Sequence, residues 1–570
     1  MKDLPPSPLP STAQLSGAAT KATFLESVPT LSVQDEEQKF ILQARVRIIM
    51  GMVIFGLFLL LLVSRLAEVS LLRAPKLFTP MASNQVKTRA DIVDRNGELL
   101  ATSLETYSLY ADPRKVWDPV ASTEAIISAL PDLDPAIVEE RLTSKKSFIW
   151  IKRNLTPKER QLVFSLGLPE LGFQIEPKRV YPRGALAAHV LGFTDIDLNG
   201  TAGVERAFDK QLSQKDAEPV KLSIDMRVQF ALTDELGAGK EKYKALAASG
   251  VVLNIKTGEI LAMASLPDFD PNRSGTASPN NRLNRASMQL YELGSTFKPI
   301  TMALAHETGV VKDGEKLPVH KPLVIQRKSI KDDHPVNVPL GVYDVLAKSS
   351  NRGASIMALR AGADAQQNLL RRLGLFERVP MELKESAAPL VAGEWQDITT
   401  ATVSYGHGIS VTPLALATAL ATLLNGGNYV APTIEKHKLG QAISLHRAVS
   451  KETSQHVVDT MRYVVTNGTG RNAAVQGYEL MGKTGTAEKL VNGEYAKKRL
   501  VTSFVAAFPH SDPQYLIFVV YDEPKSYEGS WGYATAGWNA AKTGGAVAER
   551  IAPVLGVKKA VKIAELGGAK

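Results

Sequence analysis

The longest apolar run in the chain covers residues 48–64, in which no side chain is charged. As an α-helix this run would be about 26 Å long, at the short end of what a bilayer requires. We therefore expect one transmembrane helix here. A buried core helix would have the same composition. A cleaved signal peptide fits less well, because a 47-residue leader precedes the run and no clear cleavage site follows it.

The segment before this run, residues 1–47, has the composition of a disordered tail, with four prolines among its first ten residues. Charge does not show which side of a membrane this tail would occupy. Three lysines or arginines lie within fifteen residues on each side of the run. The positive-inside rule therefore leaves the orientation open.

Polar and apolar residues alternate through residues 89–100 on either side of Asn96-Gly97, which predicts a β-hairpin. Helical periodicity follows over residues 120–142 and 157–166. We interpret residues 80–219 as a mixed α+β pedestal module without catalytic residues.

A second domain is expected over residues 220–556, opening with a strand at 221–225 that leads into a helix. Apolar strands alternate with helical segments along it, which predicts helices packed on a mostly antiparallel sheet, an α+β fold. Residues 557–570 would form a frayed tail. The predicted strands are 250–254, 260–264, 500–508 and 515–521, and the predicted helices are 354–360, 414–424, 452–466 and 545–554.

Composition limits the kinds of domain, partner and catalysis that this chain can have. A chain of 570 residues with 44% apolar content is long enough for two or three domains. The net charge of +9 suits an anionic partner such as a membrane or cell-wall polymer, but the basic residues are spread out and no nucleic-acid motif is present. The lack of cysteine excludes disulfides and thiolate catalysis. The nine histidines, His407 among them, show no metal spacing, so we expect no metal or other cofactor and interpret the histidines as structural or surface residues.

The candidate nucleophile is Ser295, in Gly294-Ser295-Thr296-Phe297-Lys298. If a helix starts near Gly294, Ser295 lies at its positive end and Lys298 follows one turn later on the same face. A lysine acts as a base only where burial or a second cation lowers its pKa. The motif therefore predicts a further cation nearby. Taken alone, it could also be an ordinary helix start.

Two further motifs follow in order: Ser349-x-Asn351 and Lys483-Thr484-Gly485-Thr486. The sequence K-T-G occurs three times, but only the copy at Lys483 follows the other motifs and enters a strand. Each motif alone could be structural, Ser349 and Asn351 as a turn or helix cap and the threonines as strand residues. No G-x-S-x-G is present, which gives a Ser-His-Asp hydrolase no support.

The three motifs together resemble those of the penicillin-recognising serine acyltransferases. An apolar anchor, a hairpin module with R-x-x-x-x-D-R-N-G and then the acyltransferase motifs are similar to the layout of class B penicillin-binding proteins, over residues 40–555. The run Tyr405-Gly406-His407-Gly408 resembles the division-type, FtsI-like members, whereas elongation-type relatives more often carry Gly-Gln-Gly. The resemblance implies a penicillin-binding, serine β-lactamase-like transpeptidase domain, with helices around an antiparallel sheet.

The resemblance also implies a reaction on peptidoglycan stem peptides ending in D-Ala-D-Ala. Ser295 would attack the penultimate D-Ala, release the terminal D-Ala and pass the acyl group to an amine of a neighbouring stem, with Lys298 as base. The N–H groups of Ser295 and Thr486 would form the oxyanion hole. The remaining roles would be proton relay for Ser349, support of Lys298 and substrate for Asn351, the second cation for Lys483, and carboxylate binding along Thr484-Gly485-Thr486.

Partners follow from the same resemblance: β-lactams as inhibitors, the bacterial inner membrane as anchor, an FtsW-like polymerase of the SEDS family, and other division proteins. The tail would be cytoplasmic and the catalytic domain periplasmic. Four alternatives stay open: an elongation-type transpeptidase, a D,D-carboxypeptidase, a non-catalytic penicillin-binding scaffold or receptor, and a serine β-lactamase. The last lacks the E-x-x-L-N motif expected between Asn351 and Lys483.

Overall fold

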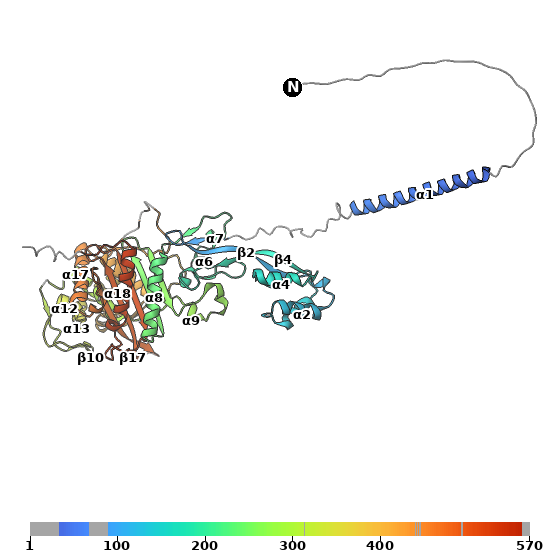
Figure 1. The fold of residues 1–570 in the computed structure, drawn as a ribbon. Coiled ribbons are helices and arrows are strands. Elements are labelled where there is room, and N and C mark those ends of the chain that lie inside the picture. Colours follow the sequence, from blue (N-terminus) through green and yellow to red (C-terminus); the bar gives the residue numbers. More distant parts are fainter. Residues whose placement is uncertain are drawn as a thin grey trace, which may run out of the picture. The chain divides into compact units, whose positions relative to one another are not determined.

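The computed structural model describes residues 34–67 and 89–560, apart from residues 313, 439–440, 442, 444–445 and 492–493. The chain divides into two units, Met1–Asn84 and Gln85–Lys570 (Figure 1). Each unit is described by itself below.

The described residues of the first unit form one helix, α1 (Gln34–Ala67). Its segment Arg45–Leu66 is long and apolar enough to cross a membrane, and it encloses the predicted span of residues 48–64. The helix begins earlier than predicted, so residues 34–47 are helical rather than disordered. Residues 1–33 of the predicted tail lie outside the described residues.

The pedestal module is built on a five-stranded sheet, and the predicted hairpin forms its start. β1 (Ile92–Val93) and β2 (Leu99–Ala111) pair antiparallel, and β3 (Ile149–Leu155) and β4 (Leu171–Val180) both pair with β2. Figure 1 shows α2 and α4 at the end of β2 and β4 that is remote from α8 and α18. Three helices begin with a proline after an Asp or Thr cap, a favourable helix start: α2 (Pro119–Ala129), α3 (Pro135–Leu142) and α4 (Pro157–Ser165).

A buried ion network holds the base of the pedestal. The Glu205 carboxylate is fully buried and accepts from Arg89 Nε at 2.5 Å and from Arg179 Nε at 2.7 Å. Tyr181 donates its hydroxyl to the same carboxylate at 3.2 Å. Asp209 Oδ1 lies 2.8 Å from Arg89 Nη1 and balances a further part of the Arg89 charge. The acid and the arginines of this region therefore hold the fold together. The pedestal also contains the short helices η2 (Pro113–Lys115), α5 (Ala188–Leu191), α6 (Gly203–Ala207) and α7 (Asp209–Leu212).

The two modules join without a loose linker. β5 (Val220–Lys221) pairs parallel with β1 of the pedestal, and Asp225 then caps α8 (Met226–Lys242). The predicted strand at 221–225 is therefore only two residues long and belongs to the pedestal sheet. One hydrophobic cluster contains Ile92 and Leu100 of the pedestal together with the core of the second domain.

The second domain is organised around a five-stranded antiparallel sheet in the order β16-β17-β18-β6-β7, which confirms the predicted fold class. The last strand along the chain, β18, lies in the middle. The strands are β6 (Ala247–Asn254), β7 (Ile260–Leu266), β16 (Met481–Val491), β17 (Glu494–Phe508) and β18 (Tyr515–Asp522).

Successive side chains along each strand of this sheet point to opposite faces and pack into two separate hydrophobic cores. Ile517 and Val519 pack in a cluster with residues of α8 and α18 (Ala540–Val554). Phe518 and Val520 lie in another cluster with residues of α11 (Lys298–Glu307) and α16 (Pro413–Leu424). The sheet is thus covered by helices on both faces.

The helical predictions hold with small shifts for α13 (Asn351–Ala361), α16 and α17 (Lys451–Asn467). α18 starts five residues before the predicted residue 545, so Lys542-Thr543-Gly544 lies inside this helix rather than before it. Smaller elements complete the domain: η3 (Pro271–Thr276), α9 (Pro279–Arg282), α10 (Arg285–Met288), η4 (Gly294–Phe297), β8 (Lys316–Leu317), β9 (Leu323–Ile325), β10 (Lys328–Ile330), β11 (Leu340–Gly341), α12 (Val342–Ala347), α14 (Ala363–Arg372), β12 (Leu390–Val391), α15 (Asp397–Val403), β13 (Ile409–Ser410), β14 (Asn428–Tyr429), β15 (His446–Arg447), η5 (Arg471–Ala473) and η6 (Ala536–Trp538).

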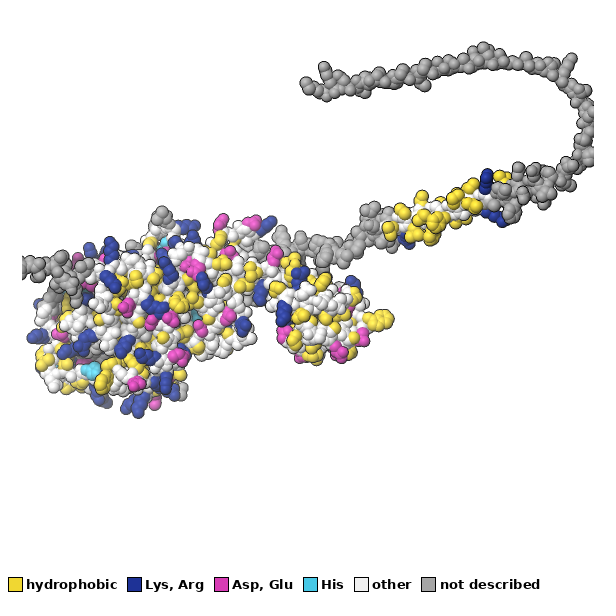
Figure 2. All heavy atoms as spheres, in the orientation of Figure 1, with side chains coloured by type: hydrophobic (Ala, Val, Ile, Leu, Met, Phe, Trp, Pro, Cys, Tyr) yellow, Lys and Arg dark blue, Asp and Glu magenta, His cyan; other side chains and the backbone are white. Residues whose placement is uncertain are grey.

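Figure 2 shows lysine and arginine side chains interspersed with acidic ones over the visible face of the second unit. This distribution agrees with the spread of basic residues along the sequence and shows no single basic patch on that face.

Candidate active site

Ser295 lies in a tight 3₁₀ turn, η4, that leads directly into α11. The turn begins at Gly294, whose φ of +56° is unfavourable for a residue with a side chain. The Lys298 Nζ lies 2.9 Å from the Ser295 Oγ. A helix start at this position was predicted, but its first turn is 3₁₀ rather than α.

Lys298 is almost fully buried, with 1% of its surface exposed. Besides Ser295, its Nζ lies within hydrogen-bond distance of three oxygens: Ser349 O at 2.6 Å, Ser349 Oγ at 3.1 Å and Asn351 Oδ1 at 2.7 Å. No carboxylate of the described residues lies within ion-pair distance of it. The oxygens in direct contact with this amine are therefore neutral dipoles rather than carboxylates.

Burial lowers the pKa of Lys298 from its usual 10.5 to about 7, while the negative charges of Asp332 and Asp333 act in the opposite direction. A substantial share of this amine is therefore unprotonated at neutral pH. A neutral amine 2.9 Å from a serine hydroxyl can accept its proton.

Ser349, the residue of the S-x-N motif that contacts Lys298 with two of its oxygens, has a strained backbone conformation. Ser349 follows α12 with a φ of +59°, a left-handed conformation that costs a non-glycine residue about 1 kcal/mol. This conformation accompanies the approach of both its carbonyl and its hydroxyl oxygen to Lys298. The cap of α13 is Ser350, whose hydroxyl accepts from Gly353 N, so Ser349 and Asn351 are not themselves the helix cap.

A segment that the sequence analysis did not single out holds this motif. Asp332 accepts from the Ser350 hydroxyl at 2.8 Å and from the Arg352 N–H at 2.9 Å. The Asn351 amide donates to the carbonyl of Lys331 at 2.9 Å. No motif marks these residues, because they act through contacts with a segment about twenty positions later.

Lys483 enters the site from β16 and is also fully buried. Its Nζ lies 3.0 Å from the Ser349 Oγ and 2.8 Å from the carbonyl of Thr484. Ser349 Oγ thus lies between two lysines. Burial first, and the charge of Lys298 second, lower the pKa of Lys483 well below its usual value. The structure brings in the predicted second lysine, but burial rather than a second cation is the main cause of the lowered pKa of Lys298.

The rest of β16 continues along η4, the turn that carries Ser295. The Thr484 Oγ1 lies 2.7 Å from the hydroxyl of Thr469, and the Thr486 Oγ1 accepts from the Ala536 N–H at 3.1 Å. A Cβ on Gly485 would lie 2.5 Å from the Leu293 carbonyl oxygen. Only glycine lets this strand lie so close to the turn before Ser295.

The run 405–408, noted in the sequence as a subtype signature, supports the turn from the other side. Gly294 N donates to the Gly406 carbonyl at 3.3 Å, and a Cβ on Gly406 would meet that same turn at 2.2 Å from the Gly294 oxygen. Tyr291 forms a β-bridge with Val411. Three chain segments therefore fix the position of Ser295.

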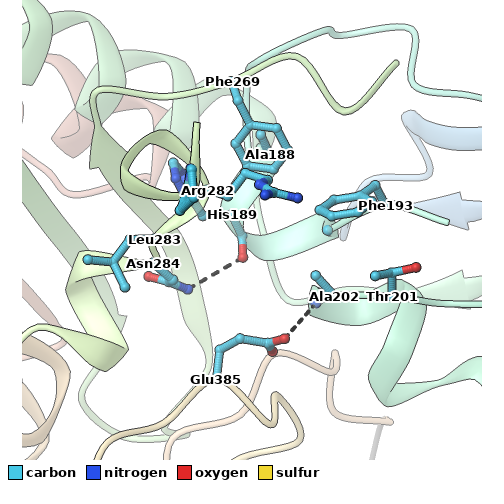
Figure 3. Close-up of a pocket in the computed structure, with 13 residues that line it drawn as sticks. Ala188, His189, Phe193, Thr201, Ala202, Phe269, Arg282, Leu283, Asn284 and Glu385 are labelled. Atoms are coloured by element: carbon cyan, nitrogen blue, oxygen red, sulfur yellow. Dashed lines mark hydrogen bonds between the residues drawn. The ribbon is translucent and has the colours of Figure 1, made fainter. Parts of the chain in front are cut away.

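A cavity of about 320 Å³ lies elsewhere, between the pedestal and the second domain. Figure 3 shows Phe193, Phe269 and Arg282 on one side of it and Glu385 on another. None of the motif residues lines this cavity. Among the residues that the structure describes, no group of three or more His, Asp or Glu is arranged to hold a metal ion.

Comparison with known proteins agrees with this site. A family model described as "Penicillin binding protein transpeptidase domain" matches residues 248–542, and one described as "Penicillin-binding Protein dimerisation domain" matches residues 84–221. The probable peptidoglycan D,D-transpeptidase FtsI of Caulobacter vibrioides is 41% identical over 487 residues, covering 83% of this chain and 82% of the relative. The peptidoglycan D,D-transpeptidase FtsI of Escherichia coli K12 is 33% identical over 478 residues, covering 78% and 80%.

Among solved structures, penicillin-binding protein 3 of Mycobacterium tuberculosis in complex with aztreonam matches with a TM-score of 0.67 and 25% identity, over 84% of this chain and 98% of that one. The transpeptidase family model alone covers more than half of the chain, so the chain belongs to the penicillin-binding proteins that carry a transpeptidase domain. With its dimerisation-domain match and its FtsI relatives, it is a class B member of the division-type, FtsI-like group. The apolar helix α1 fits the single-pass, inner-membrane character of that group.

Proposed function

We propose that this protein is a peptidoglycan D,D-transpeptidase of septal cell-wall synthesis, acting through an acyl-enzyme on Ser295. The contact that carries the proposal is the 2.9 Å approach of Lys298 Nζ to Ser295 Oγ. It pairs a buried amine whose pKa lies near 7 with a hydroxyl at the start of a helix. The D,D-transpeptidase names of the FtsI relatives support the same reaction.

In the first half-reaction, Lys298 takes the proton of the Ser295 hydroxyl as its oxygen attacks the carbonyl carbon of the penultimate D-Ala. The oxyanion is stabilised by the N–H groups of Ser295 and Thr486. The C–N bond to the terminal D-Ala then breaks. The leaving amine receives a proton from Lys298 through the Ser349 hydroxyl, which lies 3.1 Å from Lys298 Nζ.

In the second half-reaction, the amine of a neighbouring stem attacks the ester carbonyl and gives up a proton to Lys298; the C–O bond to Ser295 then breaks, and the serine oxygen receives that proton from Lys298. Asn351 keeps Lys298 in place through the 2.7 Å contact to its Oδ1. Lys483 and the hydroxyls of Thr484 and Thr486 bind the terminal carboxylate, with Gly485 admitting the strand close to the turn. An arriving carboxylate favours the protonated form of Lys483.

The protein's setting follows from the same assignment. We place the tail in the cytoplasm, the catalytic domain in the periplasm, and the chain beside an FtsW-like polymerase of the SEDS family and other division proteins. The domain division we propose is tail 1–47, span 48–64, pedestal 80–219, transpeptidase domain 220–556 and tail 557–570. Within the proposed tail, α1 already begins at Gln34. At the start of the proposed transpeptidase domain, β5 (Val220–Lys221) pairs with β1 of the pedestal.

Mass spectrometry after incubation with a labelled penicillin tests the nucleophile. Wild type should gain one adduct, on the peptide that contains Ser295, and Ser295→Ala should gain none. Ser278→Ala is a matched control, because Ser278 lies in a second S-x-N sequence at the surface; it should acylate as wild type does. An adduct on another serine would overturn the assignment.

A D,D-carboxypeptidase would use the same acyl-enzyme with water as acceptor. Product analysis separates the two reactions: a transpeptidase forms cross-linked dimer from stem peptides, whereas a carboxypeptidase releases D-Ala and forms none. Free D-Ala in the absence of any dimer, even with a large excess of acceptor, would favour the carboxypeptidase.

A further inference from the structure

The cavity of about 320 Å³ between the pedestal and the transpeptidase domain has no part in the proposed reaction. Its volume is at the low end of the roughly 300–1,000 Å³ that is usual for small-molecule sites, so it suits a small ligand. Pedestal residues between 188 and 203 form one wall, and residues of the second domain between Phe269 and Glu385 form the other. A ligand bound here would contact both modules at once.

Glu385 presents one unpaired carboxylate oxygen to this cavity. Its Oε1 accepts from the Gly203 N–H at 3.3 Å and lies 4.0 Å from Nη1 of Arg206, whose side chain is 49% exposed. Its Oε2 is buried and has no hydrogen-bond partner among the described residues. A buried acceptor without a partner is costly, so this oxygen is suited to a donor that the ligand would supply.

Arg282 adds an unpaired cation to the same cavity. Its Cζ lies 6.0 Å from the centroid of the Phe193 ring, and no carboxylate of the described residues forms an ion pair with it. Figure 3 shows Arg282 and Glu385 on different sides of the cavity. Burial lowers the pKa of His189, another lining residue, to about 4, so its ring adds no charge at neutral pH. Two opposite charges therefore line one cavity without pairing with each other.

Apolar side chains and tightly packed backbone make up much of the remaining lining. The rings of Phe193 and Phe269 pack edge to face with their centroids 5.9 Å apart. A Cβ on Gly192 would lie 1.8 Å from the Ala202 carbonyl oxygen, so only glycine lets the end of α5 approach the start of α6 so closely. The pedestal wall is thus a compact, preformed surface beside the two charges.

We propose that this cavity binds a free amino acid as its zwitterion, with the carboxylate on Arg282 and the ammonium on Glu385 Oε2. The side chain of the amino acid is apolar and packs against Phe193 and Phe269. A guanidinium pairs with a carboxylate through parallel hydrogen bonds, and a carboxylate oxygen accepts from an ammonium. A simple anion or cation would leave one of the two protein charges unpaired. This site goes beyond the proposed transpeptidase function and does not depend on it.

Isothermal titration calorimetry of the full-length protein in detergent tests the ligand class, with L- and D-phenylalanine as probes. At least one of the two should bind with a Kd of about 0.1–1 mM, the range for a small ligand with two charged contacts. N-acetylphenylalanine lacks the ammonium and phenylalaninamide lacks the carboxylate. Each should bind about tenfold more weakly, the scale of one charge-assisted hydrogen bond. Equal binding of either analogue, or no binding of phenylalanine below about 10 mM, would overturn the proposal.

Two variants assign each ligand charge to its partner. Arg282→Gln should weaken phenylalanine binding about tenfold and leave phenylalaninamide binding unchanged, because the amide has no carboxylate to lose. Glu385→Gln should weaken both and leave N-acetylphenylalanine binding unchanged, and it keeps an oxygen for the Gly203 N–H. Arg273→Gln is the matched control, an exposed arginine outside the cavity lining, and should bind phenylalanine as wild type does. Losses that do not follow the missing ligand charge would refute the arrangement.

Acylation by a labelled penicillin separates this site from the proposed reaction. The three variants should acylate within about twofold of wild type, because none of them alters a residue of the three motifs. A variant that fails to acylate is misfolded, and the analogue series on wild type then decides alone. A wild-type protein that binds phenylalanine as expected but does not acylate would refute the proposed function and leave the amino-acid site standing.

Discussion

The molecule buries charge in two places, and it treats that charge in opposite ways. In the pedestal, Glu205 is enclosed by Arg89 and Arg179, and every charge faces one of opposite sign. In the transpeptidase domain, Lys298 and Lys483 lie on either side of Ser349 Oγ with no carboxylate in ion-pair distance among the described residues. The ions of the pedestal stay charged, whereas burial without a carboxylate in ion-pair distance lowers the pKa of both lysines in the active site.

The comparison shows that buried charge stabilises the structure in the pedestal and supports the chemistry in the active site. A buried pair with matched charges costs little to keep but much to break, because removal of one partner leaves the other uncompensated. Two buried lysines destabilise the fold in return for a base with a pKa near neutral. Removal of a charge should therefore destabilise the pedestal and stabilise the active site.

The largest effect is expected for Lys298→Met, which keeps the length of the side chain and removes the amine. Penicillin acylation should fall by about 10²- to 10⁴-fold, the usual contribution of a general base. Stability should rise by about 1–4 kcal/mol, because an uncompensated buried amine is replaced by an apolar chain. Stopped-flow acylation and chemical denaturation measure the two.

Lys152→Met is the control, because Lys152 of the pedestal is paired with Asp132 and Glu159. This variant should acylate at the wild-type rate without gaining stability. A Lys298→Met protein that is less stable than wild type would show that the site is not under the strain we describe.

Glu205→Gln should have the next largest effect, on stability alone. It leaves the buried Arg179 without its anion and Arg89 with Asp209 alone, which should cost about 3–5 kcal/mol in the free energy of unfolding. Acylation of the folded protein should stay within about twofold of wild type. Asp197→Asn removes an exposed partner of Arg153 and should cost about 0–1 kcal/mol. Equal losses of stability in the two variants would show that the buried Glu205 network contributes no more than an exposed ion pair.

The pH dependence should give the smallest effect, no more than about tenfold per pH unit. The base is neutral above its pKa of about 7, so the acylation rate should be level above that pH and fall as the pH drops below it. A rate that is constant from pH 5.5 to 9 would exclude Lys298 as the titrating base.

The dependence of stability on pH should also reflect Lys298, in a direction that follows from its lowered pKa. Lys298 has a lower pKa in the folded than in the unfolded chain, so the unfolded chain binds more protons between pH 7 and 10.5. The penalty for burying Lys298 is complete below pH 7 and is relieved as the pH rises through this window. The difference in stability between wild type and Lys298→Met should therefore shrink between pH 7 and pH 10.5.

Local patterns were sufficient for much of the fold. The Asn96-Gly97 turn, the strands 500–508 and 515–521 and the helix α16 depend on residues that are neighbours in the sequence. The limits of elements were less predictable. Pairing of β5 with β1 is a contact over more than a hundred residues, and no local signal marks Val220–Lys221 as part of the earlier module.

The site shows the same division. Ser295, Lys298 and Lys483 were accessible because each lies in a motif whose order could be checked along the chain. Asp332 was not, because it acts by holding a segment about twenty residues later in the sequence. His407 was interpreted as structural from its lack of metal spacing, and its place beside Tyr495 emerges only when the run 405–408 meets the β16–β17 hairpin.

The order of the sheet also bears on how the chain can fold as it leaves the ribosome or crosses a membrane. β6 and β7 emerge first, but their neighbour β18 lies about 260 residues later and fills the centre of the sheet. Until that strand arrives, the open edge of β6 presents unpaired backbone groups that can pair with another chain. Assembly must wait for a contact of high sequence separation, which is slow. A chain stopped before Tyr515 therefore lacks the middle of its sheet, and its β16–β17 hairpin, although already synthesised, has no β18 to join it to β6.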